Sequence, residues 1–345
     1  MHCSVLRDIV VIIRKSAPLP GGLQRNARVI LPARANQRPA GQRWAAAVVR
    51  VHRIKRCRLI QKIDAFRFDA YRGGWVPAGP EPDVSRDRIA LLTWNVWFGE
   101  FLWQERFVAL LDIVRACRPD IVALQEVTPR HLEQLLAVDW VRREFRISDI
   151  TGSTLQPHGV LLLSRLPLRN LGLQELPGDK DRKMLVAEVG IGARTVCVGN
   201  LHLESSSQAA PVRLVQLDKI LPRLQGAQRT LLMSDFNFDP LQRSEQARVD
   251  RYFRDLWAKL RPDEPGFTED TAIKSMLLSH KGREKQVRFD RILLRSPRPG
   301  WIPESVQLIG TRAITPHRPG LFPSDHFGLA GSLVWSDSDD HTGSG

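Results

Sequence analysis

From residue 89 onward the chain consists of short apolar runs, several of which are followed directly by a group of polar residues. Apolar runs of about four to eight residues are typical of buried β-strands, and strand ends are where a rigid sheet presents side chains to a cleft. Five polar groups have this placement: Thr93-Trp94-Asn95, Leu124-Gln125-Glu126, Asn200–Ser205, Ser234–Asn237 and Ser324-Asp325-His326. Their repeated placement indicates a single site where residues distant in the sequence converge.

The hydrophobic pattern predicts more strands than helices. Strands are predicted over residues 89–94, 121–124, 160–163, 185–189, 195–201, 230–233, 287–294, 305–308 and 327–335. Helices are predicted over residues 101–117, 129–138 and 210–224, where apolar residues recur at helical spacing and Pro129 suits a first helical position. Because the strands do not alternate regularly with the helices, we expect an α/β fold in which two packed sheets are flanked by helices.

The basic charge of the chain is concentrated at its start. The formal net charge is +14, and residues 1–62 hold 14 Lys/Arg against one acid, whereas residues 63–345 hold 37 Lys/Arg against 36 Asp/Glu. Three interpretations of the Arg- and Pro-rich extension are open: a disordered basic arm that contacts nucleic acid or membrane, an organelle-targeting peptide, or a mis-assigned translation start. The total charge therefore says little about what the rest of the chain binds.

The remaining organisation is expected to be simple. A lead-in and linker is predicted over residues 63–88, one domain over 89–335 and a polar, disordered tail over 336–345. The chain is 43% apolar and 26% charged, as is ordinary for a globular enzyme. No apolar run approaches the roughly 18 residues that a membrane helix needs, so we expect a cytoplasmic protein, monomeric by default, with no membrane span.

The chemistry of the polar groups favours a hard cation. The four cysteines, Cys3, Cys57, Cys117 and Cys197, are far apart and form no CxxC pair, so reduced thiols are expected and neither a zinc site nor a disulfide framework is supported. Carboxylates and amides suit Mg²⁺, with Mn²⁺ as a substitute, better than they suit zinc.

Each polar group also has a local structural explanation. Side chains of these types form Asx turns, cap helices or act as buried structural groups, and this applies singly to Asn95, Glu126, Asp235, Asn237, Asp325 and His326. Local explanations account poorly for the whole ordered set. A shared site accounts for all of the groups at once.

The ordered set resembles the motifs of the endonuclease/exonuclease/phosphatase superfamily. The segments that carry the resemblance are Thr93–Asn95, Leu124–Glu126, Ser234–Asn237 and Ser324–His326. Within the superfamily, His202–Ser205, Phe267–Thr271 and Arg288–Arg291 resemble the tyrosyl-DNA phosphodiesterase 2 branch. The resemblance spans about residues 89–335 and implies a DNase I-like, four-layer α/β sandwich of two mixed or antiparallel sheets.

The resemblance also implies a magnesium-dependent hydrolase of phosphodiesters. Glu126 would supply the main anionic ligand to Mg²⁺. Asn95 would add a neutral carbonyl ligand or contact the phosphate, and Asp325 would bind the metal directly or through water. Mg²⁺ keeps several waters and binds through few carboxylates together with the substrate phosphate, so a sparse protein shell is expected.

The same carry-over gives roles to the catalytic residues. Asp235 would orient and deprotonate the attacking water, with Asn237 holding the water or a phosphate oxygen. His202 and His326 would donate hydrogen bonds to the phosphate oxygens as charge builds. Asp290 would fix the tautomer of His326 and favour its protonated form.

The chain departs from the branch pattern near the substrate. Ser234 stands where the family usually has Gly, and Phe238-Asp239-Pro240 stands where the branch tends to have Leu-Arg. The branch's Thr-Trp-Asp-Thr appears here as Thr268-Glu269-Asp270-Thr271. These departures leave the chemistry intact and weaken the expectation of a 5′-tyrosyl-DNA substrate.

Candidate substrate contacts are fewer. Trp97 and Phe236 could stack on a base or a phenol ring, and Asp270 is a further candidate from the branch motif. The basic loop 280–286 could follow a nucleic-acid backbone or could be a solvated turn.

Three functions remain open. A metal-dependent phosphodiesterase acting on nucleic acid or a nucleic-acid adduct is the first. A phosphatase or phosphodiesterase of small or lipid-like substrates, such as inositol phosphates or sphingomyelin, is the second, because the catalytic domain is near neutral. A non-catalytic binding protein on the same fold is the third, although it predicts the loss of at least one catalytic residue.

Overall fold

A computed structural model of the chain describes residues 60–297 and 299–337. The basic extension predicted over residues 1–62 lies outside this part of the chain except for its last three residues, and so does most of the polar tail. Cys117 and Cys197 form no disulfide, whereas Cys3 and Cys57 lie outside the described residues. Within that part, no helix has the length and apolar character needed to cross a membrane.

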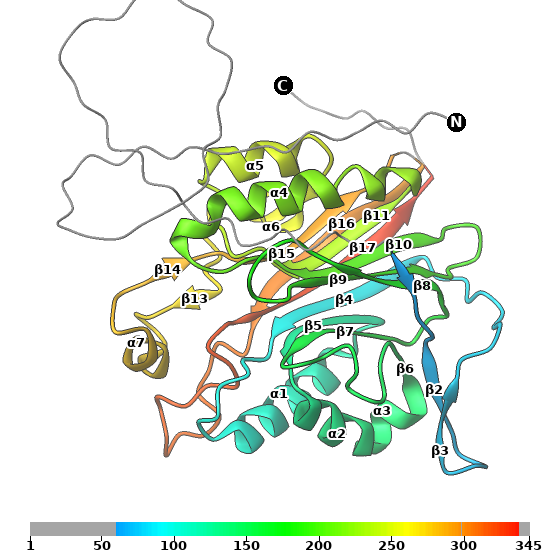
Figure 1. Cartoon of the computed structure of the whole chain (residues 1–345), viewed down its shortest axis with the longest axis horizontal. Coiled ribbons are helices and arrows are strands. Elements are labelled where there is room, and N and C mark those ends of the chain that lie inside the picture. Colours follow the sequence, from blue (N-terminus) through cyan, green and yellow to red (C-terminus); the bar gives the residue numbers. More distant parts are fainter. Residues whose placement is uncertain (1–59, 298, 338–345) are drawn as a thin grey trace, which may run out of the picture. The chain divides into compact units, whose positions relative to one another are not determined.

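Two large sheets form the centre of the described structure (Figure 1). One sheet has eight strands among the described residues, in the order β16-β17-β4-β5-β7-β6-β2-β3. Their bounds are Gly300–Ile309 (β16), Gly328–Ser336 (β17), Arg88–Asn95 (β4), Ile121–Val127 (β5), Gly159–Ser164 (β7), Arg146–Ile147 (β6), Phe66–Asp69 (β2) and Gly74–Pro77 (β3). β4 and β5 run parallel, while β17 pairs antiparallel with β4.

The second large sheet has seven strands in the described residues, in the order β1-β8-β9-β10-β11-β15-β12. Their bounds are Gln61–Lys62 (β1), Leu168–Glu175 (β8), Lys183–Val189 (β9), Val196–His202 (β10), Thr230–Asp235 (β11), Asp290–Arg295 (β15) and Arg254–Asp255 (β12). β10 and β11 run parallel, and β15 pairs antiparallel with β11. A separate small sheet pairs β13 (Glu269–Asp270) with β14 (Gln286–Val287).

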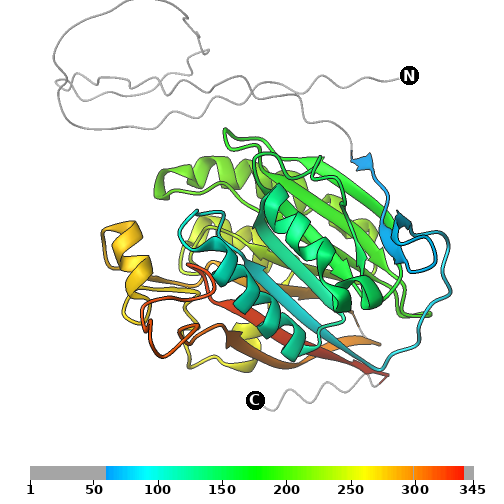
Figure 2. The ribbon, with the colours of Figure 1, turned by 90° about the horizontal axis from the view of Figure 1, so that it is seen from below.

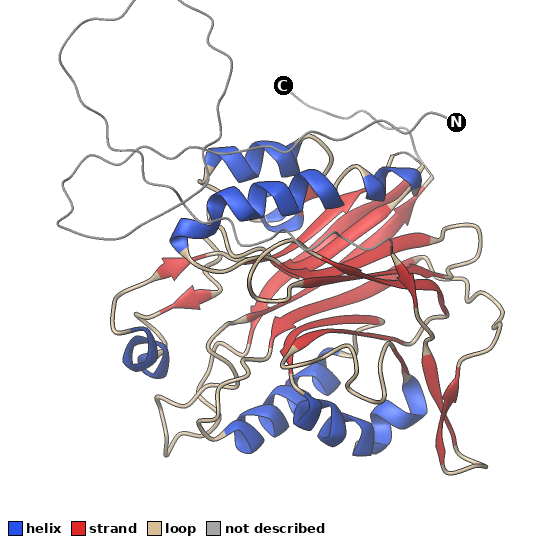
Figure 3. Cartoon of the chain, viewed as in Figure 1, coloured by secondary structure: helices blue, strands red, loops and turns tan. Residues whose placement is uncertain are grey.

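Helices cover the outer faces of both large sheets (Figure 3). Those on the side of the eight-stranded sheet are α1 (Trp103–Cys117), α2 (Pro129–Ala137) and α3 (Asp139–Glu144), and Figure 2 shows them lying across its strands. On the other side lie α4 (Ala210–Ile220) and α5 (Arg243–Asp250), while α6 (Leu256–Leu260) contacts β15 and β16 and α7 (Ser275–Lys281) follows β13. The four layers confirm the predicted DNase I-like sandwich.

Apolar side chains fill each of the three interfaces between these layers. The alternation along β4 places Ile89 and Leu91 between the two sheets, whereas Leu92 and Trp94 face α1. A third cluster, which includes Leu217 and Phe236, packs α4 against the seven-stranded sheet. Burial of this apolar area is the main force that holds the layers together.

Strand direction explains why one edge of the sandwich collects the polar groups. Asn95 ends β4 and Glu126 lies near the end of the parallel strand β5, so both reach the same edge. In the other sheet His202 and Asp235 end the parallel strands β10 and β11 and are register partners. Asp290 begins the antiparallel strand β15 directly opposite Asp235, because antiparallel neighbours start where their partners end.

The boundaries of three predicted elements were wrong. The strand predicted over residues 305–308 begins five residues earlier, at Gly300, because Pro303 and Glu304 interrupt its apolar pattern. The strand predicted over residues 287–294 is two strands in different sheets, since the Thr268 hydroxyl accepts hydrogen bonds from the backbone N–H groups of Phe289 and Asp290 and interrupts the ladder. The helix predicted over residues 210–224 ends at Ile220, and Pro222, which has no N–H to donate, precedes a short 3₁₀ turn. The predicted lead-in also contains strands β2 and β3.

Candidate active site

The strand ends and the turn before β17 surround a cleft of about 560 Å³. Of the residues predicted for the site, those lining the cleft are Trp97, Glu126, His202, Asp235, Asn237, Asp325 and His326. Asn95 and Asp290 lie directly behind them, hydrogen-bonded to Asp235 and His326 respectively. The structure therefore brings together all of the predicted metal and catalytic residues.

Asp235 is the most heavily contacted carboxylate of the cleft. Its Oδ2 accepts a hydrogen bond from Asn95 Nδ2 at 3.0 Å and lies 3.2 Å from His202 Nε2, while Oδ1 accepts from the backbone N–H of Asn237 at 2.9 Å. Burial opposes ionisation, but His202 and these hydrogen bonds hold the pKa of Asp235 well below its usual range. These contacts therefore favour the ionised form of the carboxylate.

His202 connects Asp235 to a buried arginine. Arg182 Nη1 lies 2.8 Å from His202 Nδ1, and because a guanidinium can only donate, Nδ1 must accept and the ring proton must sit on Nε2, facing Asp235. Burial, with the charge of Arg182, lowers the pKa of His202 to about 4. His202 is thus a neutral link whose two nitrogens both have partners.

The turns that follow the strands place these side chains. Asp235 forms an Asx turn with Asn237, and Asn95 Oδ1 likewise accepts from the backbone N–H of Trp97 at 3.0 Å. Trp97, Glu126 and Asn237 have positive φ angles of 59°, 60° and 54°. Left-handed backbone is uncommon outside glycine and often marks functional sites. The turn explanation of Asn95, Asp235 and Asn237 is therefore correct, and it is compatible with their place at the cleft.

Glu126 and Asp325 are two neighbouring acids that line the cleft, Asp325 buried and Glu126 half-buried. Glu126 does not cap α2, because Thr128 does so. Instead a bulge in β5 turns Glu126 into the cleft, where its Oε2 accepts from the backbone N–H of Phe98 at 3.2 Å. Burial, with the nearby charge of Asp325, raises the pKa of Glu126 to about 7. A bound cation would relieve this repulsion, so the donor set fits a divalent metal.

His326 lies between two carboxylates. Its Nδ1 is 2.7 Å from Asp290 Oδ2 and its Nε2 is 3.2 Å from Glu269 Oε1. Burial opposes protonation, but Asp290 and the neighbouring Asp325 raise the pKa of His326 well above its ordinary value. Two groups of ligand atoms lie close enough together to hold a metal in the described residues: Asp235, Asp290 and His326, and Glu269, Asp325 and His326.

Sequence reasoning did not single out several residues of the site. Arg182 precedes β9 without any motif, and Glu269 was visible only as the acid that replaces Trp in Thr268–Thr271. Buried Lys274 donates from Nζ to the Ser324 carbonyl at 3.0 Å, which supports the turn before β17. Buried Arg106 donates to the carbonyls of Phe101 and Gly99, and no local pattern distinguishes it from a surface arginine of α1.

Two of the proposed substrate contacts are not in the cleft. Phe236 is fully buried, because its ring packs 6.0 Å from Phe238 under the Arg291 guanidinium in the α4 interface. Asp270 Oδ1 accepts from the backbone of Ala272 and from Gln286, and Asp270 does not line the cleft.

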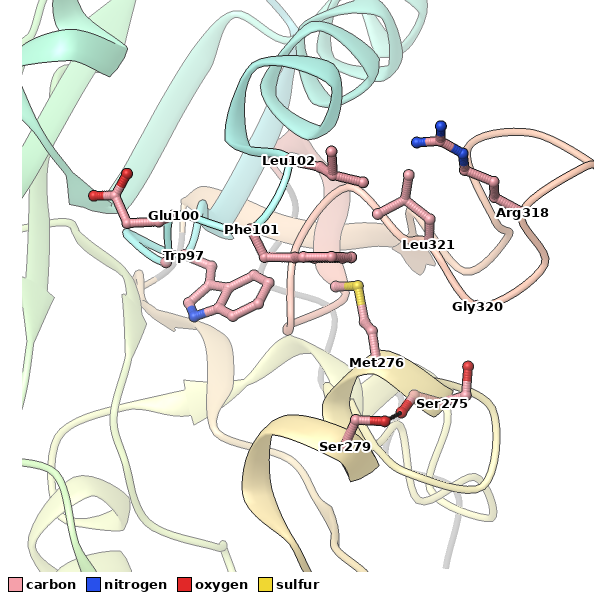
Figure 4. A pocket seen from close by; sticks show the side chains of 11 residues that line it. Trp97, Glu100, Phe101, Leu102, Ser275, Met276, Ser279, Arg318, Gly320 and Leu321 are labelled. Carbon is pink, nitrogen blue, oxygen red and sulfur yellow. Dashed lines mark hydrogen bonds between the residues drawn. The ribbon is translucent and has the colours of Figure 1, made fainter.

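Trp97 does face the cleft, and its ring also borders a second pocket. This pocket has a volume of about 770 Å³ and lies between the loop after β4, α7 and the segment around Leu321. Figure 4 shows the side chains of Trp97, Phe101, Met276 and Leu321 turned toward its centre. Trp97 is therefore the residue placed between the polar cleft and an apolar pocket.

The fold and the cleft define a class of protein. Residues 92–326 match the model of the Endonuclease/Exonuclease/phosphatase family, and the chain belongs to this family. Among solved structures, truncated Caenorhabditis elegans TDP2 has a TM-score of 0.60 at 24% identity, covering 72% of this chain and 97% of that one. Danio rerio TDP2 complexed with single strand DNA product has a TM-score of 0.61 at 22% identity, covering 72% and 99%. These likenesses show the shared fold.

The particular relatives agree with the branch indicated by the motifs. Tyrosyl-DNA phosphodiesterase 2 of Xenopus laevis is 29% identical over 251 residues, which cover 70% of this chain and 65% of the relative. The human protein of the same name is 27% identical over 267 residues, covering 74% and 71%. The chain thus spans about 65% of the length of the Xenopus relative.

Proposed function

We propose that this chain is a magnesium-dependent phosphodiesterase that hydrolyses a phosphodiester of nucleic acid, or of a nucleic-acid adduct, by in-line attack of water. The observation that carries the proposal is the environment of Asp235, a buried carboxylate that faces the cleft and is kept ionised by Asn95 and His202. Such a group orients a water molecule and accepts its proton as the bond to phosphorus forms.

Glu126, with Asn95 and Asp325, would hold the metal. Oxygen donors of this kind suit Mg²⁺, and Mn²⁺ as a substitute. When bound, the cation would supply positive charge to the phosphate oxygens and to the leaving oxygen. The raised pKa of Glu126 supports this assignment, since an acid of this kind gains most from a neighbouring cation.

His326 would donate to a non-bridging phosphate oxygen. Asp290 holds Nδ1 at 2.7 Å and so directs the other ring nitrogen, Nε2, toward the cleft. A charged donor fixed in this way stabilises the negative charge of the transition state. The resemblance implied that His202 also donates to a phosphate oxygen, but its Nε2 faces Asp235. We propose that His202 instead positions the Asp235 carboxylate. Asn237, whose Nδ2 donates to the Leu203 carbonyl, would present its oxygen to the water.

The substrate class is supported by the cations of the cleft and by the relatives. Lys180, Arg283 and Lys285 line the same cleft as the acids, where they could pair with phosphates. The curated relatives are named tyrosyl-DNA phosphodiesterases, and we propose a 5′-tyrosyl-DNA-like adduct as the substrate of this chain.

An activity panel tests the proposal. The full chain with Mg²⁺ should release tyrosine from a 5′-phosphotyrosyl oligonucleotide, and chelation of the metal should abolish the release. Inositol phosphates, sphingomyelin and abasic duplex DNA form the comparison arms. Faster turnover of inositol phosphate or sphingomyelin would replace nucleic acid as the substrate class, and absence of turnover on every arm would refute the hydrolase.

A further inference from the structure

We propose that Glu269 occupies the phosphate position on His326 in the substrate-free site and must be displaced when the scissile phosphate binds. The inference rests on the proposed function for the identity of the ligand, a phosphate group. It concerns a residue that the proposed mechanism does not use.

The contact between Glu269 and His326 excludes a second acceptor. Glu269 Oε1 lies 3.2 Å from His326 Nε2, while Asp290 occupies Nδ1 at 2.7 Å. Each ring nitrogen makes one strong hydrogen bond. A phosphate oxygen can therefore reach Nε2 only if the Glu269 carboxylate moves away from it.

Charge favours the same exclusion. Glu269 is 2% exposed and borders the cleft, so its negative charge would face a phosphate across little water. Like charges at such short distance repel strongly in a buried site. In the substrate-free site the Glu269 carboxylate therefore holds the position at His326 Nε2 that a phosphate oxygen would take in the complex.

Lys285 provides a place for the displaced carboxylate. Its Nζ forms an ion pair with Glu269 Oε2, the oxygen that does not face His326. Glu269 belongs to the small β13–β14 sheet, in which it is the register partner of Val287, and Lys285 directly precedes β14. The ion pair can persist while the carboxylate swings from His326 toward Lys285.

The position of the small β13–β14 sheet allows the Glu269 carboxylate to move away from His326. β13 and β14 have two residues each and form a sheet of their own, separate from the two large sheets. Figure 1 shows β13, β14 and α7 beside the sandwich, not within it. Thr268 stays hydrogen-bonded to Phe289 and Asp290 while the Glu269 side chain rotates, so the movement requires no change in the ladders that hold Asp235 and Asp290.

Binding of inorganic phosphate tests the inference without any need for turnover. In the full chain, Glu269→Gln should bind phosphate about tenfold more tightly than the wild type by calorimetry, because the charge-assisted competitor for His326 is lost. Glu269→Asp keeps the charge and the Lys285 partner but shortens the reach to His326, so it should also tighten binding. Loss of a merely structural carboxylate would not raise affinity.

A matched control distinguishes loss of the Glu269–His326 contact from loss of a negative charge at another position. Glu284→Gln removes the same charge from an exposed position one residue before Lys285 and should change phosphate affinity less than twofold. Unchanged or weaker binding in both Glu269 variants, or an equal gain in Glu284→Gln, would overturn the inference.

The two proposals fail separately. A wild type that cleaves 5′-tyrosyl DNA while neither Glu269 variant gains phosphate affinity would leave the function standing and refute the displacement. A wild type that cleaves no phosphodiester, but whose Glu269 variants bind phosphate more tightly, would refute the proposed function and leave the displacement of Glu269 standing.

Discussion

Asp235 and Asp290 are register partners on adjacent antiparallel strands, and each carboxylate contacts a different histidine. Like charges directly opposite each other destabilise a sheet. His202 lies 3.2 Å from Asp235, and His326 lies 2.7 Å from Asp290. These contacts offset the repulsion between the two carboxylates. The two histidines differ in charge, because the pKa of His202 is lowered to about 4 whereas that of His326 is raised.

Asp235→Asn should abolish turnover while metal binding is retained. The amide cannot accept a proton from water, so we expect kcat on a 5′-phosphotyrosyl oligonucleotide to fall by about a thousandfold or more. Titration calorimetry with Mn²⁺ should still show binding, because Glu126 and Asp325 are unchanged. Turnover near the wild-type rate would contradict the proposed role of Asp235.

Asp290→Asn should shift the alkaline limit of activity to lower pH. The Asp290 carboxylate raises the pKa of His326 in the folded protein, so the wild type keeps the imidazolium to a pH well above 6.5. The stability that this pair contributes is fully present below the unfolded pKa near 6.5 and is lost as pH rises through the raised folded pKa. Without the carboxylate, His326 should lose its proton nearer its ordinary pKa. The pH profile of kcat measures the shift. If activity is lost at the same alkaline pH in the wild type and in the variant, a protonated His326 is not required.

Glu126→Gln should make the metal-free protein more stable at high pH and remove its response to metal. Burial raises the pKa of Glu126 to about 7, so its acid form stabilises the fold below the unfolded pKa near 4.5, and that contribution is lost as pH rises through about 7. At pH 8 the variant should melt at least about 2–4 °C higher than the metal-free wild type. Mg²⁺ should raise Tm only in the wild type, and equal Mg²⁺ shifts would exclude Glu126 as a ligand.

Metal affinity of the wild type should also fall as pH drops below about 7. A proton on Glu126 competes with the cation for the same oxygens. Calorimetric titrations with Mn²⁺ at pH 8 and pH 6 should show weaker binding at pH 6. A pH-independent affinity would place the main ligand elsewhere.

Lys274→Met should lower activity more than stability. The buried Lys274 ammonium donates to the Ser324 carbonyl at 3.0 Å and lies 3.8 Å above the Phe327 ring. Methionine keeps the packing but leaves the carbonyl without this donor, so the turn carrying Asp325 and His326 should loosen and kcat should fall by about tenfold. Lys259→Met, at an exposed position of α6, is the control and should have no effect. Equal kcat for both variants would show that the contact does not position the turn.

The sequence by itself determined the residues at the strand ends. Asn95, Glu126, His202 and Asp235 could be predicted because an apolar run followed by a polar residue is a local signal. His326 lies instead in the turn before β17 and could be predicted only because the order of the motifs along the chain resembles one family. The parallel pairing of β4 with β5 and of β10 with β11 then brings the first four residues to one edge. Local pattern and strand direction were sufficient for this part of the site.

Tertiary structure alone decided which other side chains reach the cleft. Phe236 follows Asp235 in the sequence, yet its ring is buried under Arg291, a contact between residues far apart in the chain. Arg182 becomes part of the site only because the start of β9 places it against His202. Glu269 does so only because the small β13–β14 sheet places it against His326. Burial and the pKa values that follow from it depend on such non-local packing, which no local pattern in the sequence records.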